Sequence, residues 1–290
     1  MEGIRISGFA DEISSDFDRQ LSTVTRLGMG FISLRSADGK NVADYTPEEV
    51  EKDLLPRLKA AGVGVSSLGS PIGKIAIEDE DAFRDQLEKL ERLCGICKLL
   101  DCRYIRVFSF YIPEGRDAEQ YRDKVIEKLR AFEAVGRRNG VVLIHENEKE
   151  IYGDVADRCL TILKEVDSPY LRAAFDFANF VQCGEDTVRA WELLHEYVVY
   201  IHIKDAVSDS NENVVCGTGE GHIPELLKRA IRDEGYRGFL TLEPHLVFFD
   251  ALRSLERKAA ADVIREDKAK DGADGYRMQY EALQGILAAI

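Results

Sequence analysis

The stretch that decides the fold is an apolar run that ends in acidic residues, Val141-Val142-Leu143-Ile144-His145-Glu146-Asn147-Glu148. Three later runs repeat the pattern, Ala173-Ala174-Phe175-Asp176, Val199-Tyr200-Ile201-His202-Ile203-Lys204-Asp205 and Leu240-Thr241-Leu242-Glu243-Pro244-His245. β-Branched and aromatic residues of this kind favour strands. The sequence thus predicts buried strands that each end in ionisable side chains.

The same strands alternate with helical patterns along the whole chain. Eight strands are predicted, at 4–9, 31–34, 64–68, 104–108, 141–145, 172–176, 198–203 and 238–243. Helices are predicted between them, including 16–27, 47–61, 82–100, 118–139, 154–165, 185–195 and 223–234. Strict alternation predicts parallel strands, and eight units in 290 residues predict one α/β domain over residues 1–290, a closed (β/α)₈ barrel.

A doubly wound open sheet is the structural alternative. That fold needs a Gly-rich phosphate-binding turn after its first strand, where this chain has Phe9-Ala10-Asp11-Glu12. One segment breaks the alternation: residues 252–275 follow the last strand, carry many charges and precede the last helix. This charged extension is interpreted as a lid or an extra helix, and a solvated surface helix is the favoured alternative.

Composition narrows the class of protein. The chain has 39 Lys+Arg against 53 Asp+Glu, a net charge of −14, which opposes binding to nucleic-acid phosphates. No run approaches the about 18 apolar residues of a membrane span, and the start has no secretory pattern, so we expect a cytoplasmic location. Cys94 and Cys97 have redox or zinc spacing, but that spacing also places both on one buried helix face, which is the interpretation we adopt.

Four strand ends supply a predicted metal site. In a barrel of this kind the chemistry lies where strands run into the following loops, and a buried carboxylate there needs a cation beside it. Each residue taken alone could instead cap a helix or bond the backbone, but four successive strands share the pattern. We therefore predict that Glu146, Asp176, His202 and Glu243 bind one divalent ion, with Mn²⁺ first and Mg²⁺, Co²⁺ or Zn²⁺ as alternatives.

Successive side chains of a strand point to opposite faces, and this predicts which residues next to the four candidates point into the barrel. Lys204 shares the side of His202, and His245 shares the side of Glu243, so both are predicted to line the pocket. His145 starts on the opposite side from Glu146 and reaches substrate only where the strand bends into its loop.

Other polar residues fall on the same face. Arg35, Lys74 and Arg106 could donate to sugar hydroxyls or hold a phosphate, with surface ion pairing as the alternative. Gly217-Thr218-Gly219-Glu220-Gly221 lacks the Lys-Ser/Thr of a phosphate-binding loop and is interpreted as a turn before the seventh helix.

At these residues the chain resembles the xylose-isomerase-like TIM-barrel superfamily, the sugar phosphate isomerases and epimerases that also include endonuclease IV and inosose dehydratase. The resemblance covers essentially the whole chain and is carried by His145-Glu146-Asn147-Glu148-Lys149, Phe175-Asp176-Phe177-Ala178-Asn179-Phe180, His202-Ile203-Lys204-Asp205 and Leu242-Glu243-Pro244-His245. It implies that Glu146 and Glu243 bind the metal and also exchange protons with a keto-sugar through an enediolate.

Two departures from the relatives matter. Endonuclease IV binds three zinc ions with a larger set of histidines than the five of this chain, which argues against DNA repair.

The pair His145-Glu146 is similar to the metal-binding subunit of C-glycoside deglycosidases, in which enolisation beside a 3-keto group precedes β-elimination of the aglycone. That resemblance implies a lyase with His145 as base and a small β-rich partner subunit, whereas the broader class implies an isomerase or epimerase that could form homo-oligomers. A sugar-binding barrel without catalysis is the third alternative.

Overall fold

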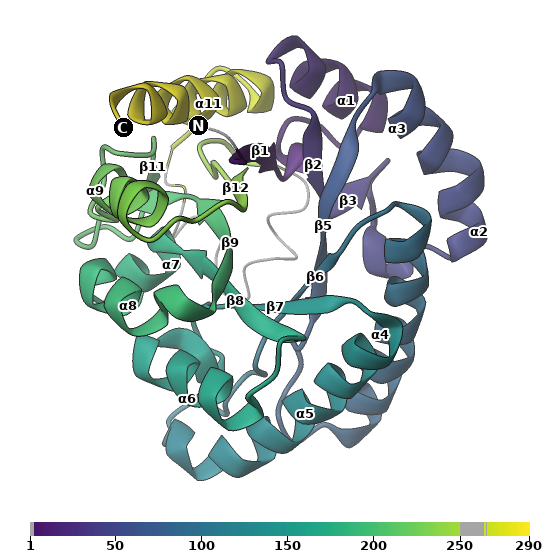
Figure 1. The fold of residues 1–290 in the computed structure, drawn as a ribbon, viewed down its shortest axis with the longest axis vertical. Coiled ribbons are helices and arrows are strands. Elements are labelled where there is room, and N and C mark those ends of the chain that lie inside the picture. Colours follow the sequence, from purple (N-terminus) through teal and green to yellow (C-terminus); the bar gives the residue numbers. More distant parts are fainter. Residues whose placement is uncertain (1–2, 250–263, 265) are drawn as a thin grey trace.

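The computed structural model describes residues 3–249, 264 and 266–290. Eight parallel strands form one sheet that curls into a ring, in the order β1-β12-β9-β8-β7-β6-β5-β2 (Figure 1). The strands of this ring are β1 (Arg5–Gly8), β2 (Phe31–Leu34), β5 (Gly64–Ile72), β6 (Tyr104–Val107), β7 (Val142–Glu146), β8 (Leu171–Asp176), β9 (Val198–Ile203) and β12 (Phe239–Leu242). The predicted (β/α)₈ barrel is thereby confirmed, and so are its eight strands.

The ring is nearly closed. β1 pairs in register with β12, whereas β1 and β2 share only one isolated bridge, Phe9 to Ser33. A seam therefore runs between β1 and β2. Two short hairpins lie outside the ring: β3 (Ser36–Ala37) pairs with β4 (Lys40–Asn41), and β10 (Asp205–Ala206) pairs with β11 (Asn213–Val214).

Helices surround the ring (Figure 1). They are α1 (Phe17–Arg26), α2 (Pro47–Glu49), α3 (Leu55–Ala61), α4 (Glu80–Leu99), α5 (Arg122–Asn139), α6 (Ala156–Val166), α7 (Phe177–Gln182), α8 (Thr187–Leu194), α9 (Ile223–Lys228) and α11 (Gly272–Ala289). Asp or Thr side chains cap several of their N-termini, such as Asp186 on α8, and glycine in the left-handed region ends α3 and α5 at Gly62 and Gly140.

Most element boundaries agree with the sequence to within two residues, and the differences have physical causes. The predicted helix 47–61 is one α-helical course interrupted by a π-helical turn at Val50–Leu54. α7 was not predicted, because Phe177-Ala178-Asn179-Phe180-Val181 is buried on every side and carries no polar face. Of the charged extension 252–275, residues 252–263 and 265 lie outside the described part of the chain, and α11 begins within it at Gly272.

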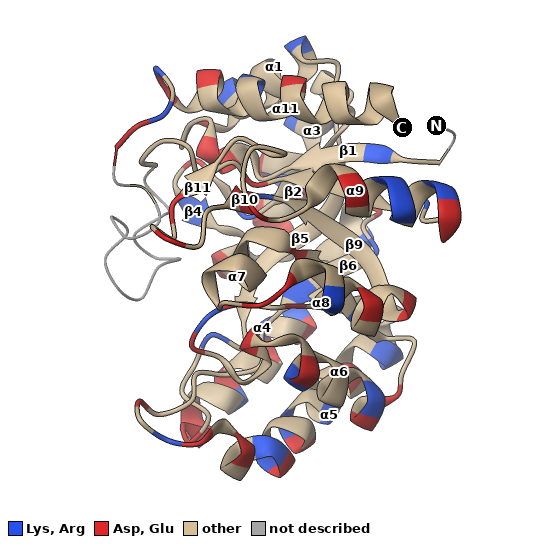
Figure 2. Ribbon diagram, turned by 90° about the vertical axis from the view of Figure 1, so that its left-hand side faces the viewer, with Lys and Arg blue, Asp and Glu red and all other residues tan. Residues whose placement is uncertain are grey.

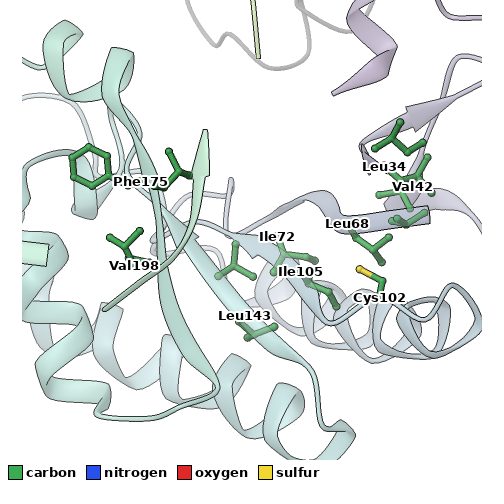
Figure 3. Packing of buried hydrophobic residues seen from close by; sticks show 14 of the residues in the cluster. Leu34, Val42, Leu68, Ile72, Cys102, Ile105, Leu143, Phe175 and Val198 are labelled. Carbon is green, nitrogen blue, oxygen red and sulfur yellow. The ribbon is translucent and has the colours of Figure 1, made fainter. Parts of the chain in front are cut away.

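The apolar core lies mainly between the ring and the helices. Leu34, Leu68, Ile105 and Leu143 project from successive strands into this layer, as Figure 3 shows, and Cys94 and Cys97 of α4 are buried in it. A smaller cluster fills the inside of the ring with Val142, Ile144, Ala174, Tyr200 and Phe239. Residues at alternate positions of β7 therefore face inward, and the next residue inward after Ile144 is Glu146.

Charges are spread over the outer surface. Figure 2 shows basic and acidic residues interspersed along the ribbons of α5, α6 and α9. Among the described helices, none is both long enough and apolar enough to cross a membrane.

Candidate active site at the carboxyl ends of the strands

The four predicted metal-binding residues meet inside the ring. Glu146 ends β7, Asp176 ends β8, His202 lies near the end of β9, and Glu243 directly follows β12. One ligand atom from each lies within 4.8 Å of all the others, and all four residues are at most 3% exposed. Strand ends far apart in sequence thus place three carboxylates and one imidazole around a single point.

The donor set fits a divalent ion. Oδ2 of Asp176 and Oε2 of Glu243 are buried and accept no hydrogen bond in the described structure. Nδ1 of His202 lies 3.0 Å from Oε1 of Glu146, 3.4 Å from Oε2 of Glu243 and 3.7 Å from Oδ2 of Asp176. Buried carboxylate oxygens without donors are costly unless a cation binds them, so these atoms suit a hard metal ion with oxygen and imidazole ligands.

The titration of the site reflects this crowding. Burial raises the pKa of Asp176. Burial also raises the pKa of Glu146, but the charges of His202 and Arg106 outweigh it and bring that pKa down to about 2. Burial lowers the pKa of His202, but Glu146 and the other carboxylates raise it well above its usual value. In the absence of a metal ion, a protonated His202 therefore partly balances the carboxylates.

Local sequence fixes the orientation of Asp176. Its Oδ1 accepts a hydrogen bond from the backbone N–H of Asn179 at 2.8 Å and so caps α7. The side chain of Asn147 bonds both the N–H and the carbonyl oxygen of Asp176, each at 3.0 Å. With Oδ1 occupied by the helix cap, Oδ2 is left to face the cluster.

Three predicted substrate-binding cations all lie at this face, and each contacts a carboxylate. Nη1 of Arg106 donates to Oε2 of Glu146 at 3.0 Å. Nζ of Lys204 donates to Oδ1 of Asn179 at 2.7 Å and lies 3.5 Å from Oδ2 of Asp176. Nζ of Lys74 donates to Oε2 of Glu148 at 3.2 Å. Their contact with substrate stays a prediction.

The two predicted histidines occupy different positions. His145 follows Ile144 and so projects to the outer side of β7, where its ring lies against Gly153. Its Nε2 has no hydrogen-bond partner in the described structure, and burial lowers its pKa to about 4, so the ring is neutral at pH 7. His245 lies inside, with Nε2 3.4 Å from Oε1 of Glu12 and 3.5 Å from Oε1 of Glu243.

Sequence reasoning missed two residues near the site. Asn179 connects Lys204 to α7, and its position three residues after Asp176 is the helix-cap spacing that could have signalled it. Asp205 is fully buried and accepts hydrogen bonds from the backbone N–H groups of Gly217, Gly219 and Gly221 at 2.8 to 3.0 Å. The glycine-rich turn therefore wraps around a carboxylate of the chain itself.

The ion pairs around the cluster leave a net charge of −2 when the imidazoles are neutral, which one divalent ion would neutralise. Carboxylates outnumber cations by two when the imidazoles are neutral. The carboxylates are Asp11, Glu12, Glu146, Glu148, Asp176 and Glu243, and the cations are Arg35, Lys74, Arg106 and Lys204. Such a site can polarise a carbonyl oxygen and accept a proton from the neighbouring carbon.

The chain is similar to one protein family and to a curated protein, as follows. A model of the xylose isomerase-like TIM barrel family matches residues 21–267. A curated relative, the 3-dehydroshikimate dehydratase of Bacillus anthracis, is 23% identical over 150 residues, which are 49% of this chain and 54% of the relative. The chain thus matches about half the length of that relative.

Solved structures share the fold over nearly the whole chain. An L-ribulose 3-epimerase superposes with a TM-score of 0.76 at 18% identity, covering 99% of this chain and 95% of the epimerase. The IOLI protein, described with a bound zinc atom, superposes with a TM-score of 0.75 at 12% identity, covering 99% of this chain and 98% of its own. At these low sequence identities the similarity shows a shared fold.

Proposed function

Because the chain belongs to the xylose isomerase-like TIM barrel family, we propose that it is a metal-dependent enzyme that isomerises or epimerises a keto-sugar. The substrate is a ketose or another sugar with a carbonyl group, free or phosphorylated. The proposed ion is Mn²⁺, with Mg²⁺, Co²⁺ and Zn²⁺ as alternatives, because three carboxylates and one imidazole favour hard or borderline ions over thiolate-bound ones.

The observation that carries the proposal is the matched geometry of Glu146 and Glu243. Each glutamate comes from a different strand end, directs one oxygen to the His202 cluster and offers the other to an arginine. Arg106 contacts Oε2 of Glu146 at 3.0 Å, and Arg35 contacts Oε1 of Glu243 at 2.8 Å. An epimerase needs two carboxyl groups at one site, one ionised to remove a proton from one face of the carbon and one that has taken up a proton from solvent to return it on the other, and two glutamates from separate strands of the ring suit this.

The chain's own residues would divide the work as follows. A metal ion held by Glu146, Asp176, His202 and Glu243 would polarise the carbonyl and adjacent hydroxyl oxygens of the sugar. Glu146 or Glu243 accepts the proton from the carbon next to the carbonyl and later releases it to water, while the other glutamate takes a proton from water and donates it to the opposite face of that carbon. The ammonium of Lys204, held by Asn179, stabilises negative charge on the enediolate oxygen.

A lyase that uses the same first step is the second candidate, and His145 favours it. A neutral imidazole with an unpartnered Nε2 is a base separate from the metal-binding residues and can accept a proton while all four of them stay on the ion. The curated relative is named a dehydratase, a class of enzyme that eliminates water. In this version the chain cleaves 3-oxo-glucosyl C-glycosides by β-elimination and works with a small β-rich partner. The outward direction of His145 places this candidate second.

Proton NMR in deuterated water tests the proposal on Mn²⁺- or Mg²⁺-loaded protein, with ketohexoses, keto-inositols and 3-keto-glucosides as substrates. Exchange or inversion of a substrate proton without fragmentation supports the isomerase or epimerase, and release of the aglycone supports the lyase. Glu146→Gln and Glu243→Gln should each abolish exchange while His145→Ala retains much of it; loss of nearly all activity in His145→Ala favours the lyase. Binding of keto-sugars without any exchange would refute both and support a non-catalytic barrel.

A further inference from the structure

Arg35 lies directly after β2, on the far side of the barrel seam from β1, and its side chain is fully buried. Nε donates to Oδ2 of Asp11 at 2.8 Å, and Nη2 lies 3.3 Å from Oε1 of Glu12. Asp11 and Glu12 come from the 3-10 turn Ala10–Glu12 after β1. Two carboxylates from the neighbouring loop thus fix the guanidinium across the seam.

The third contact of Arg35 reaches the metal cluster. Nη1 donates to Oε1 of Glu243 at 2.8 Å, while the ring of Phe9 lies 4.5 Å from the guanidinium carbon. With Oε1 engaged, the remaining oxygen of Glu243, Oε2, has no hydrogen-bond partner in the described structure and lies 3.4 Å from Nδ1 of His202. Glu243 therefore directs Oε1 to Arg35 and Oε2 to the cluster.

From these contacts we propose that Arg35 is a positioning residue for the metal: it holds Glu243 so that Oε2 alone faces the ion. The inference rests on the proposed metal site and goes beyond it, because Arg35 was predicted only as a possible donor to substrate or a surface ion pair. A rigid planar fork is required, since one ammonium group cannot span three carboxylates in this geometry. Partners that orient a metal ligand typically change metal affinity 10- to 100-fold when they are removed.

The proposal makes Arg35 act through Glu243, and a double-mutant cycle tests that route. Mn²⁺ affinity is measured by electron paramagnetic resonance of the free ion for wild type, Arg35→Met, Glu243→Gln and the double variant. We expect Arg35→Met to weaken binding about 10- to 100-fold in the wild-type background and less than about twofold in the Glu243→Gln background. Equal weakening in both backgrounds would show a general structural effect and overturn the proposal, as would unchanged affinity in Arg35→Met.

Two further variants guard the interpretation. Arg57→Met removes an arginine that also contacts two carboxylates, Asp38 and Asp18, but on the outer surface, and it should leave Mn²⁺ affinity unchanged. If Arg35→Met does not fold, Arg35→Lys keeps the charge and loses the fork, and it should still weaken Mn²⁺ binding about tenfold; wild-type affinity in Arg35→Lys overturns the proposal. Wild type that binds none of Mn²⁺, Mg²⁺, Co²⁺ and Zn²⁺ overturns the metal site itself and this inference with it.

Discussion

Replacing Asp176 by asparagine separates two roles of one carboxylate. Oδ1 caps α7 through the N–H of Asn179, and Oδ2 faces the proposed metal site without a hydrogen-bond partner in the described structure. Asparagine caps helices about as well as aspartate, so Asp176→Asn should keep the fold. The metal-free protein should change in stability by no more than about 1 kcal/mol, because the variant removes a buried carboxylate whose pKa burial raises.

The effect on metal binding should be larger. Loss of one anionic ligand is expected to weaken binding about 100-fold, or about 2.7 kcal/mol. At a metal concentration of about 100 times the wild-type Kd, metal stabilises the wild type by about 2.7 kcal/mol and the variant by about 0.4 kcal/mol. An unfolding entropy of about 2.1 cal/mol/K per residue over 290 residues converts these values to Tm increases of about 4 °C and below about 1 °C.

The assay is thermal unfolding followed by circular dichroism, with chelator and with Mn²⁺. Asp186→Asn is the matched control, because Asp186 caps α8 in the same way, by accepting the N–H of Val188 at 2.8 Å, and belongs to no metal cluster in the described part of the chain. The control should keep the full Mn²⁺-induced increase. The reasoning is refuted if Asp176→Asn keeps it too, or if Asp186→Asn loses it.

Three further predictions concern the rest of the barrel. A Cβ on Gly73, whose φ is +92°, would lie 2.0 Å from the carbonyl oxygen of Phe108. Gly73→Ala should therefore lower the free energy of unfolding in urea by about 3 kcal/mol or more, whereas Gly39→Ala, with open space around the added Cβ, should lower it by about 1 kcal/mol. Equal losses in the two variants would contradict the steric argument. Burial raises the pKa of the Cys94 and Cys183 thiols to about 12, so native protein at pH 8 should react with iodoacetamide at least about tenfold more slowly than unfolded protein; equal rates by mass spectrometry would contradict this. Burial raises the pKa of Tyr45 to about 12, while an unfolded tyrosine ionises near pH 10, so the folded state keeps a proton that the unfolded state loses and stability falls from pH 10 to 12. Tyr45→Phe loses the hydrogen bond to the carbonyl oxygen of Ala37 and should be about 1 kcal/mol less stable at pH 8. Its stability should also fall less between pH 10 and 12 than that of the wild type. An unchanged pH dependence in urea unfolding would contradict the raised pKa of Tyr45.

The alternation of elements and the convergence of four strand-end side chains were predictable because both depend on local patterns. A strand of four to six residues and its closing acid are contiguous, and parallel strands bring their carboxyl ends together. The direction of His145 also followed from alternation along β7. These features need no knowledge of distant contacts.

The partners of the arginines were not predictable in the same way. Arg35 and Glu243 lie 208 residues apart and meet because the ring brings β2 near β12 across the seam. The sequence alone left Arg35 and Arg106 equally suited to substrate binding or ion pairing. Asp205 and its three glycine N–H groups were missed for the related reason that a turn rich in glycine shows its flexibility but not the group it encloses.

The pairing of β1 has a consequence for how the chain folds during synthesis. The first strand made obtains its backbone ladder from β12, the last strand of the ring, and only one bridge from its sequence neighbour β2. In a ribosome-bound chain whose residues Phe239–Leu242 have not yet left the ribosome, β1 has no strand to form its ladder with, and Arg35 cannot contact Glu243. Such long-range closure slows folding, so arrested chains that end before residue 239 should leave the N-terminal strand open to chaperones and proteases.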